Sequence, residues 1–493
     1  MVPGKEMKRL LTICMVLVLA AMAASAQTRI PCDRTYRDNP ERALTRADAA
    51  KKWEGKVVIP VLLMAYPDVG FSVSDEDIVA YWDYILNKPG YNENGAHGSV
   101  ADYFKKQSSG LFEPVFEIIG PVTVPEKRAY YGENRNGKQG EDVKDYELIR
   151  DACVAAGIDW KVYDSDDDGD IDVVLTVFAG PGENRGGPAD AIWPHKSVNG
   201  LKVGDVYVGP YTCVSELDNT GKLDGYGTFV HEFSHCLQLP DLYPVSGSAY
   251  SIFDEWDLMD GGNYAFHGFG IPNYSAFERW ICGWYEFEEL TDPTTITDMP
   301  VWDEEPVAYL IRNDDEPEEY YILENRRQQG FDYYIPGNGL LVTHVKRYSI
   351  GDLFPNNSSY TKVGLVPADN RDYHQSEAYF HRDDGKKTSP RSNYLSLAAY
   401  PYVVGDSANN HLTDTSIPAM TFHKPVTNIT MDANGRISFD FMKEETAIRG
   451  VRSVGVKSEE WYDLRGRRLP AAPSTPGIYI IRDSSGKTKK IIQ

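Results

Sequence analysis

The sequence predicts an α+β protein in which a domain that mixes helices and strands, of the α/β or α+β class, precedes an all-β domain and a short β module. Helix-like and strand-like patterns alternate up to about residue 284, which indicates a domain of mixed secondary structure. Short β-type runs separated by turn residues follow from residue 293 to about residue 442. The expected parts are a signal peptide (1–26), a leader or pro-segment (27–50), the mixed domain (51–290), the β-rich domain (291–442) and the terminal module (443–493).

The first residues have the features of a secretory signal peptide. A positively charged start precedes an apolar run from Leu10 to Met22, and Ala24-Ser25-Ala26 provides a small-x-small cleavage site. We therefore expect cleavage after Ala26 and a secreted location, extracellular or at the cell surface. No later apolar run reaches the length of about 18 residues that a transmembrane helix needs, so no transmembrane segment is predicted.

Composition limits the possible functions. The chain has 493 residues, is 42% hydrophobic and carries a formal net charge of −23. The apolar content is sufficient for packed cores. The acidic balance argues against nucleic acid as a partner, because phosphate neutralisation needs clustered lysine and arginine. Excess carboxylates also supply oxygen ligands that hard cations such as calcium prefer.

Local patterns predict the first elements of the mixed domain. The apolar run 57–64 has the length of a buried strand, although Pro60 is unusual in a central strand. Serine–aspartate capping pairs then begin one helix at residue 74 and another at residue 99. The run 171–178 predicts a second buried strand.

Later elements are predicted to be strands. The runs 307–311, 320–323 and 340–343 are apolar, short and separated by turn-rich spacers, which is typical of an all-β domain. A further run at 477–481 predicts a strand in the terminal module.

One motif points directly to chemistry: the run His231-Glu232-Phe233-Ser234-His235 follows H-E-x-x-H. On a helix, His231 and His235 lie about 40° apart on one side, whereas the apolar residues around them face the core. This arrangement directs two imidazoles into a cleft, as catalytic zinc requires, and places Glu232 to take a proton from a zinc-bound water. The alternative is an amphipathic helix with two incidental histidines.

A third protein ligand is expected after this helix. Pro240 cannot continue the helix, so the chain turns and brings Asp241 back toward the metal. Gln238 stands where a glycine would ease a left-handed turn, and it either bears roughly 1–2 kcal/mol of strain or turns differently. Glu255 and Glu278 therefore remain alternative carboxylate ligands.

Three further features are assigned near the metal. The segment 256–262 predicts a methionine-containing turn beneath the metal, with a tight Asp-Gly-Gly turn as the plainer alternative. Tyr264 would then hydrogen-bond the developing oxyanion. Cys32, early in the mature chain, is a candidate thiolate that masks the zinc in a latent form.

An aspartate-rich loop predicts a second metal site. The run 164–172 follows D-x-D-x-D-G-x-I-D, in which alternate carboxylates converge on one calcium ion and Gly169 permits the sharp turn. The closing glutamate of a complete EF-hand is missing, because Leu175 occupies its position. The alternative is a solvated acidic turn. The expected calcium ligands are Asp164, Asp166, Asp168, Asp170 and Asp172.

Several segments together carry a resemblance to a known family. They are 98–104, 179–183, 191–195, 231–235, 239–243 and 256–259, followed by 321–326 and 336–342 in the β-rich domain. Through them the run 57–284 resembles the immune inhibitor A-like, metzincin-type family of secreted bacterial zinc metallopeptidases. The resemblance implies a zincin-like catalytic domain with a mixed sheet, zinc-dependent endopeptidase activity on protein or peptide substrates, and calcium-supported structure.

The end of the chain resembles a shortened C-terminal sorting domain of the type nine secretion system of Bacteroidetes. The run 461–468, the strand-like run 477–481 and the basic ending 487–490 carry this resemblance. It implies outer-membrane secretion machinery as a partner. The alternative is a small β module that packs on its neighbour.

Two other functions stay open beside the secreted zinc endopeptidase. One is a catalytically inactive surface adhesin or protein-binding module on the same fold, which the departure from glycine at Gln238 would favour. The other is a zinc-dependent hydrolase of non-peptide substrates.

Overall fold

The computed structural model describes Cys32 and residues 53–218, 220–245, 252–357, 360–371, 395–405, 407–417 and 421–443, with four short strands beyond residue 459. The chain divides into two compact units, Met1–Lys443 and Glu444–Gln493. The expected signal peptide lies outside the described residues, as does the leader apart from Cys32. No helix within the described part is long and apolar enough to cross a membrane. The domain boundaries expected from the sequence stay predictions.

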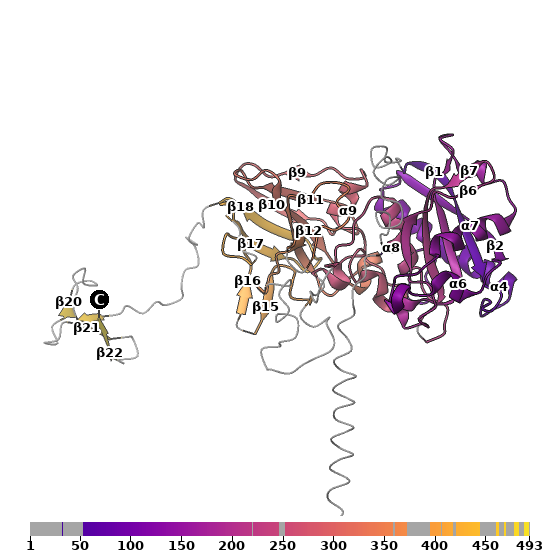
Figure 1. The fold of residues 1–493 in the computed structure, drawn as a ribbon. Coiled ribbons are helices and arrows are strands. Elements are labelled where there is room, and N and C mark those ends of the chain that lie inside the picture. Colours follow the sequence, from indigo (N-terminus) through magenta and orange to yellow (C-terminus); the bar gives the residue numbers. More distant parts are fainter. Residues whose placement is uncertain are drawn as a thin grey trace, which may run out of the picture. The chain divides into compact units, whose positions relative to one another are not determined.

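A five-stranded mixed sheet organises the first part of the larger unit (Figure 1). Neighbouring strands are parallel except the last, β5, which runs antiparallel to β8 at one edge. The predicted strand at 57–64 is confirmed, and Pro60 precedes the stretch that pairs with strands on both sides. In spatial order the strands are β2 (Phe112–Thr123), β1 (Gly55–Ala65), β4 (Val174–Pro181), β8 (Pro210–Leu217) and β5 (His195–Val198).

Helices cover both faces of this sheet. Because side chains alternate along a strand, Val61 and Leu63 of β1 face one apolar cluster and Leu62 and Met64 face another. The first cluster contains residues of α4 (Asp75–Asn87), α5 (Val100–Gln107) and α8 (Gly227–Cys236). The second contains residues of α7 (Asp145–Ala156). The sheet is thus buried between two helical layers.

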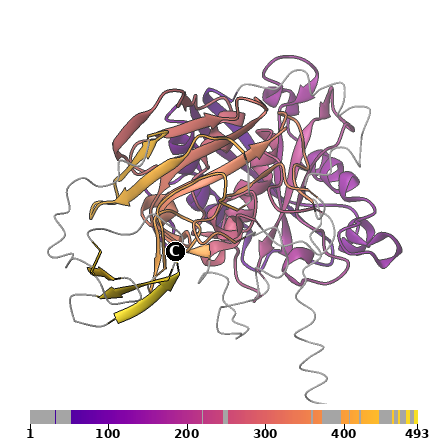
Figure 2. The ribbon, with the colours of Figure 1, turned by 90° about the vertical axis from the view of Figure 1, so that its left-hand side faces the viewer.

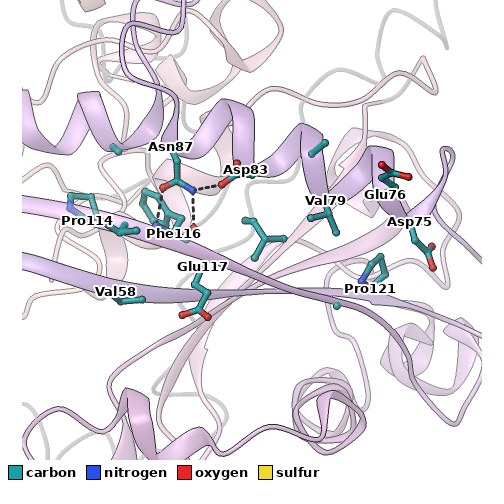
Figure 3. A pocket seen from close by; sticks show the side chains of 15 residues that line it. Val58, Asp75, Glu76, Val79, Asp83, Asn87, Pro114, Phe116, Glu117 and Pro121 are labelled. Atoms are coloured by element: carbon teal, nitrogen blue, oxygen red, sulfur yellow. Dashed lines mark hydrogen bonds between the residues drawn. The ribbon is translucent and has the colours of Figure 1, made fainter.

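The capping predictions for α4 and α5 are confirmed. The Ser74 hydroxyl accepts a hydrogen bond from the Asp77 N–H at 3.2 Å, and Ser99 forms a reciprocal capping box with Asp102. At the end of α4, the Asn87 amide donates to the Phe116 carbonyl at 2.7 Å and accepts from its N–H at 2.9 Å (Figure 3). These bonds join α4 to β2 beside an open groove that no residue of the H-E-x-x-H motif lines.

The second part of the larger unit is built mainly from antiparallel strands, which run side by side in Figure 2. The predicted strands at 307–311, 320–323 and 340–343 are confirmed as β11, β12 and β13. One sheet contains β14 (Val363–Leu365), β13 (Gly339–Lys346), β12 (Glu319–Arg326), β11 (Ala308–Arg312) and β9 (Glu288–Glu289). A second contains β10 (Thr294–Met299), β18 (Ile437–Phe441) and β17 (Val426–Met431), and a hairpin is formed by β15 (Tyr402–Val404) and β16 (Ser407–Asn409).

The larger sheet of this second part contributes to two cores. Leu323 of β12 packs in a cluster with Phe439 of the smaller sheet. Its neighbour Ile322 points the other way, into the same apolar cluster as Phe229 of α8 and Phe277 of α9 (Ala276–Ile281). Continuous apolar packing therefore connects the strands to the helix that carries the H-E-x-x-H motif.

The structure also contains shorter elements. A small sheet orders β3 (Asp170–Ile171), β7 (Val206–Val208) and β6 (Lys202–Val203), and α6 spans Arg128–Gly132. The smaller unit orders β20 (Arg468–Leu469), β19 (Glu460–Tyr462), β21 (Ile478–Arg482) and β22 (Thr488–Ile492), so β21 confirms the strand predicted at 477–481.

Candidate metal centre

Helix α8 carries the H-E-x-x-H motif near the junction of the two parts of the larger unit (Figure 1). Its aromatic side chains, Phe229 and Phe233, belong to the large apolar cluster. His231, Glu232 and His235 are also buried, with exposed fractions of 3%, 2% and 2%. Burial of three ionisable groups on one short helix needs compensating contacts.

The end of α8 determines where the chain goes next. The Leu239 N–H donates to the Ser234 carbonyl and the Gln238 N–H donates to the His235 carbonyl, both at 3.1 Å. Gln238 has a φ of 74°, so it adopts the left-handed conformation that often ends a helix and that is usually occupied by glycine. The strain expected at this position is thus located in the backbone of Gln238, at a cost of about 1 kcal/mol.

The turn brings Asp241 to the two histidines. Its Oδ1 lies 3.4 Å from His231 Nε2 and 3.3 Å from His235 Nε2. Cys32 Sγ lies 3.1 Å from His231 Nε2, 3.0 Å from His235 Nε2 and 3.1 Å from Asp241 Oδ1. All four side chains are buried. The structure therefore brings together the three predicted zinc ligands and adds Cys32 to them.

Backbone carbonyls orient both imidazoles. His231 Nδ1 lies 2.9 Å from the Leu258 carbonyl oxygen, and His235 Nδ1 lies 2.7 Å from that of Leu239. Because a carbonyl can only accept, Nδ1 carries the proton in each ring and Nε2 presents its lone pair to the cluster. Two such imidazoles, a carboxylate and a thiol are nitrogen, oxygen and sulfur donors of the kinds that bind zinc in proteins, so this group of side chains could hold a metal ion.

Electrostatics at the cluster are dominated by burial and by the neighbouring ligands. Burial by itself raises the pKa of Asp241, but the positive charge that His235 and His231 carry when they are protonated lies against the carboxylate and lowers this pKa below its usual value. Burial, followed by the charges of Asp241 and Glu232, raises the pKa of the Cys32 thiol well above its usual value. The thiol accordingly donates to Asp241 Oδ1, and a cation among these groups would favour the thiolate.

The predicted methionine turn supports the same ligands. Met259 is completely buried, its N–H donates to Asp257 Oδ1 at 2.8 Å, and its carbonyl accepts from the Leu242 N–H at 2.9 Å. The preceding carbonyl, that of Leu258, accepts from His231. The turn thus holds both His231 and the residue that follows Asp241. Burial raises the pKa of the Asp257 carboxyl to about 7, although its bond from Met259 acts in the opposite direction.

Two tyrosines lie near this cluster of four side chains. The Tyr264 hydroxyl accepts from the Asn184 amide at 3.3 Å, and its ring faces the guanidinium of Arg185 at 4.7 Å. The hydroxyl of Tyr243, which is buried, donates to Cys32 Sγ at 3.4 Å. Tyr243 therefore reaches the cluster itself. The sequence analysis missed it, although its place two residues after Asp241 was an available signal.

The alternative carboxylate ligands have other positions. Glu278 is the N3 residue of the α9 capping box, where its Oε2 accepts from the Ser275 N–H at 2.6 Å. Glu255 lies in the short 3₁₀ helix Asp254–Trp256 and is not among the described side chains that cluster with His231.

The aspartate-rich loop forms a second, more exposed cluster. Asp164, Asp166 and Asp168 place carboxylate oxygens within 4.8 Å of one another, and the latter two side chains are exposed. Asp164 accepts from the N–H groups of Asp168 and Gly169, both at 3.0 Å. Gly169 has a φ of 88°, which explains the glycine.

Asp170 and Asp172 lie outside this group of three, within the part of the chain that the structure describes. Asp170 is buried in β3, and the Asp172 N–H donates to the Tyr163 carbonyl at 2.9 Å. The structure thus brings together three of the five predicted calcium ligands.

One more buried cluster was not anticipated. It contains Asp142, Asp145 and His195. His195 Nδ1 lies 2.7 Å from the Trp193 carbonyl, and Nε2 lies 3.0 Å from the Tyr211 hydroxyl and 3.5 Å from Asp145 Oδ2. Because both ring nitrogens are engaged by protein groups, His195 has a structural role here.

Comparison with known families identifies the region that contains the centre. Residues 71–286 match the family model described as immune inhibitor A peptidase M6, catalytic domain. The match supports an immune inhibitor A-like metallopeptidase, which implies protein substrates and suggests a metal. The matched region contains His231, His235 and Asp241, whereas Cys32 precedes it. A search of curated proteins finds no match to the chain.

Proposed function

We propose that the chain is a secreted zinc endopeptidase in which His231, His235 and Asp241 hold the metal and Glu232 is the general base. The convergence of both Nε2 atoms on Asp241 Oδ1, at 3.4 and 3.3 Å, is the observation that carries this proposal. The match of the surrounding residues to a peptidase catalytic domain gives it a reaction class.

The residues around the centre have complementary roles in peptide hydrolysis. When bound, zinc would polarise the scissile carbonyl and lower the pKa of water toward about 7. Glu232 follows His231 on α8 and lies close enough to Cys32 for its charge to add to the effect of burial on the pKa of that thiol. Glu232 would take a proton from the attacking water and pass it to the leaving amine. The hydroxyls of Tyr243 and Tyr264 would donate to the developing oxyanion.

The acidic loop and the chain ends complete the proposal. Asp164, Asp166 and Asp168 would bind a structural calcium ion, with Asp170 and Asp172 as further ligands. The signal peptide, cleaved after Ala26, would direct secretion, and the terminal module would engage outer-membrane secretion machinery.

The decisive experiment is the substitution Glu232→Gln. It preserves side-chain shape but removes the base, so cleavage of an unstructured protein such as casein should fall by about 10²–10⁴-fold while the zinc content stays unchanged. Glu255→Gln is the control, since Glu255 lies outside the cluster, and it should retain both zinc and activity. Full activity of Glu232→Gln would contradict the mechanism. Loss of zinc from Glu255→Gln would contradict the ligand set.

A further inference from the structure

We infer that Cys32 is a fourth protein ligand to the metal, so that the full chain holds a closed site of one cysteine, two histidines and one aspartate and is latent. This inference rests on the metal centre proposed above. It assigns a specific function to a residue outside the region that matches the peptidase family model.

The positions of the four donor atoms support a tetrahedral site. Cys32 Sγ lies 3.0–3.1 Å from three donor atoms, and Asp241 Oδ1 lies 3.3–3.4 Å from both Nε2 atoms. The sixth distance, between the two Nε2 atoms, is within 4.8 Å. In a regular tetrahedron with edges of about 3.2 Å, the centre lies about 2 Å from each corner, which is close to the length of a zinc–ligand bond. One ion would therefore reach all four donors with little movement.

The backbone of Cys32 is held as well as its sulfur. Its N–H donates to Asp241 Oδ2 at 3.3 Å, and its carbonyl accepts from the Lys196 N–H at 2.9 Å. Lys196 belongs to β5, the antiparallel edge strand of the central sheet. The Tyr243 hydroxyl donates to the sulfur. Contacts to three separate segments, which are α8, the turn after it and β5, distinguish Cys32 from a cysteine that is near the histidines by chance.

A fourth protein ligand has a direct consequence for catalysis. Catalytic zinc sites have three protein ligands and keep the fourth position for water or substrate, whereas four protein ligands characterise structural sites. Cys32 Sγ takes that fourth position. The Cys32 carbonyl also accepts a hydrogen bond from the Lys196 N–H of β5, the edge strand of the five-stranded sheet. When Cys32 binds the metal, a zinc–sulfur bond forms and the thiol proton leaves to solvent. Departure of Cys32 reverses both changes and admits water.

Cobalt substitution tests the sulfur ligand without relying on activity. The full chain loaded with Co²⁺ should show an intense near-ultraviolet sulfur-to-cobalt charge-transfer band. This band should be lost in Cys32→Ser and kept in Cys282→Ser, a partly buried cysteine that the cluster does not include. A chain that binds cobalt without this band would overturn the inference and leave the proposed peptidase intact. A chain that binds no cobalt would overturn both.

A measurement on the wild-type chain covers the case of a Cys32 variant that folds poorly, and a second measurement tests latency directly. In the wild-type chain, alkylation followed by peptide mapping should label Cys32 only after the metal is removed by a chelator, whereas equal labelling with and without metal would overturn the inference. In a folded Cys32→Ser variant, casein cleavage before any processing should begin at least about tenfold faster than in wild type, because the open state is no longer a minor population. Equal initial rates would contradict latency.

Discussion

The two acidic metal-site candidates differ in how their carboxylates are held. In the histidine cluster, Asp241 is completely buried, and the imidazoles beside it are oriented by carbonyls from two different turns. In the aspartate-rich loop, Asp166 and Asp168 are exposed, and the loop's carboxylates bind N–H groups of the loop itself. The first site is positioned by the fold, whereas the second is positioned by its own turn.

This difference predicts different consequences of losing one carboxylate. A buried donor set that is oriented before the ion binds loses affinity steeply when one donor is removed. An exposed loop is screened by water, so its carboxylates repel one another less and the ion contributes mainly stability. Loss of a carboxylate from the histidine cluster should therefore lower activity, whereas loss of one from the loop should lower the free energy of unfolding.

The largest expected effect follows from Asp241→Asn. Replacing the buried carboxylate by an amide removes the anionic ligand, so zinc affinity should fall by more than about 100-fold, and casein cleavage should be lost with it. Competition with a chromophoric chelator measures the affinity. Asp298→Asn, an exposed position with the same chemical change, should have no effect on either quantity. Unchanged zinc affinity in Asp241→Asn would remove Asp241 from the ligand set.

The loop provides the opposite test through Asp166→Asn. With calcium at about 100 times its dissociation constant, binding should stabilise the wild-type fold by about 2.7 kcal/mol, and the variant should lose most of this gain without losing zinc. Thermal unfolding with and without added calcium, at fixed zinc, measures it. Asp167→Asn is the matched control, because the Asp167 carboxylate contacts Lys161 at 3.1 Å and lies outside the group of three. Equal calcium responses in all three proteins would favour a solvated acidic turn.

The sequence predicted features that depend on neighbouring residues. The capped start of α4, the strand at 57–64 and the turn that returns Asp241 all follow from local patterns and are present. The left-handed Gln238 also fits one of the two outcomes expected for it.

Features that depend on the fold were harder to predict. The Leu258 carbonyl reaches His231 from 27 residues away, and the Cys32 sulfur reaches it from 199 residues away. The pairing of His195 with Asp145 likewise joins distant segments. Cys32 was predicted as a candidate thiolate only from its place early in the mature chain, and no local sequence pattern specifies these approaches, which depend on how distant segments pack together.

A third prediction concerns pH and uses Asp257 in the methionine turn. Burial raises its pKa from 3.8 to about 7, so the folded protein retains a proton that the unfolded chain releases. The free energy of unfolding should therefore fall as the pH rises from about 4 to about 7, and Asp257 alone should contribute up to about 1.4 kcal/mol per pH unit. Asp257→Asn should flatten this dependence in chemical denaturation. Parallel curves for wild type and variant would contradict the raised pKa.

The smallest effect is expected where α8 ends. Gln238→Gly places at φ 74° the residue that tolerates this conformation best, so the free energy of unfolding should rise by up to about 1 kcal/mol, partly offset by the greater freedom of glycine in the unfolded chain. Gln139→Gly is the control, because Gln139 is exposed and does not have a positive φ, and it should destabilise the fold slightly. A clear loss of stability in Gln238→Gly would mean that the glutamine side chain, rather than the backbone conformation, closes the helix and positions Asp241.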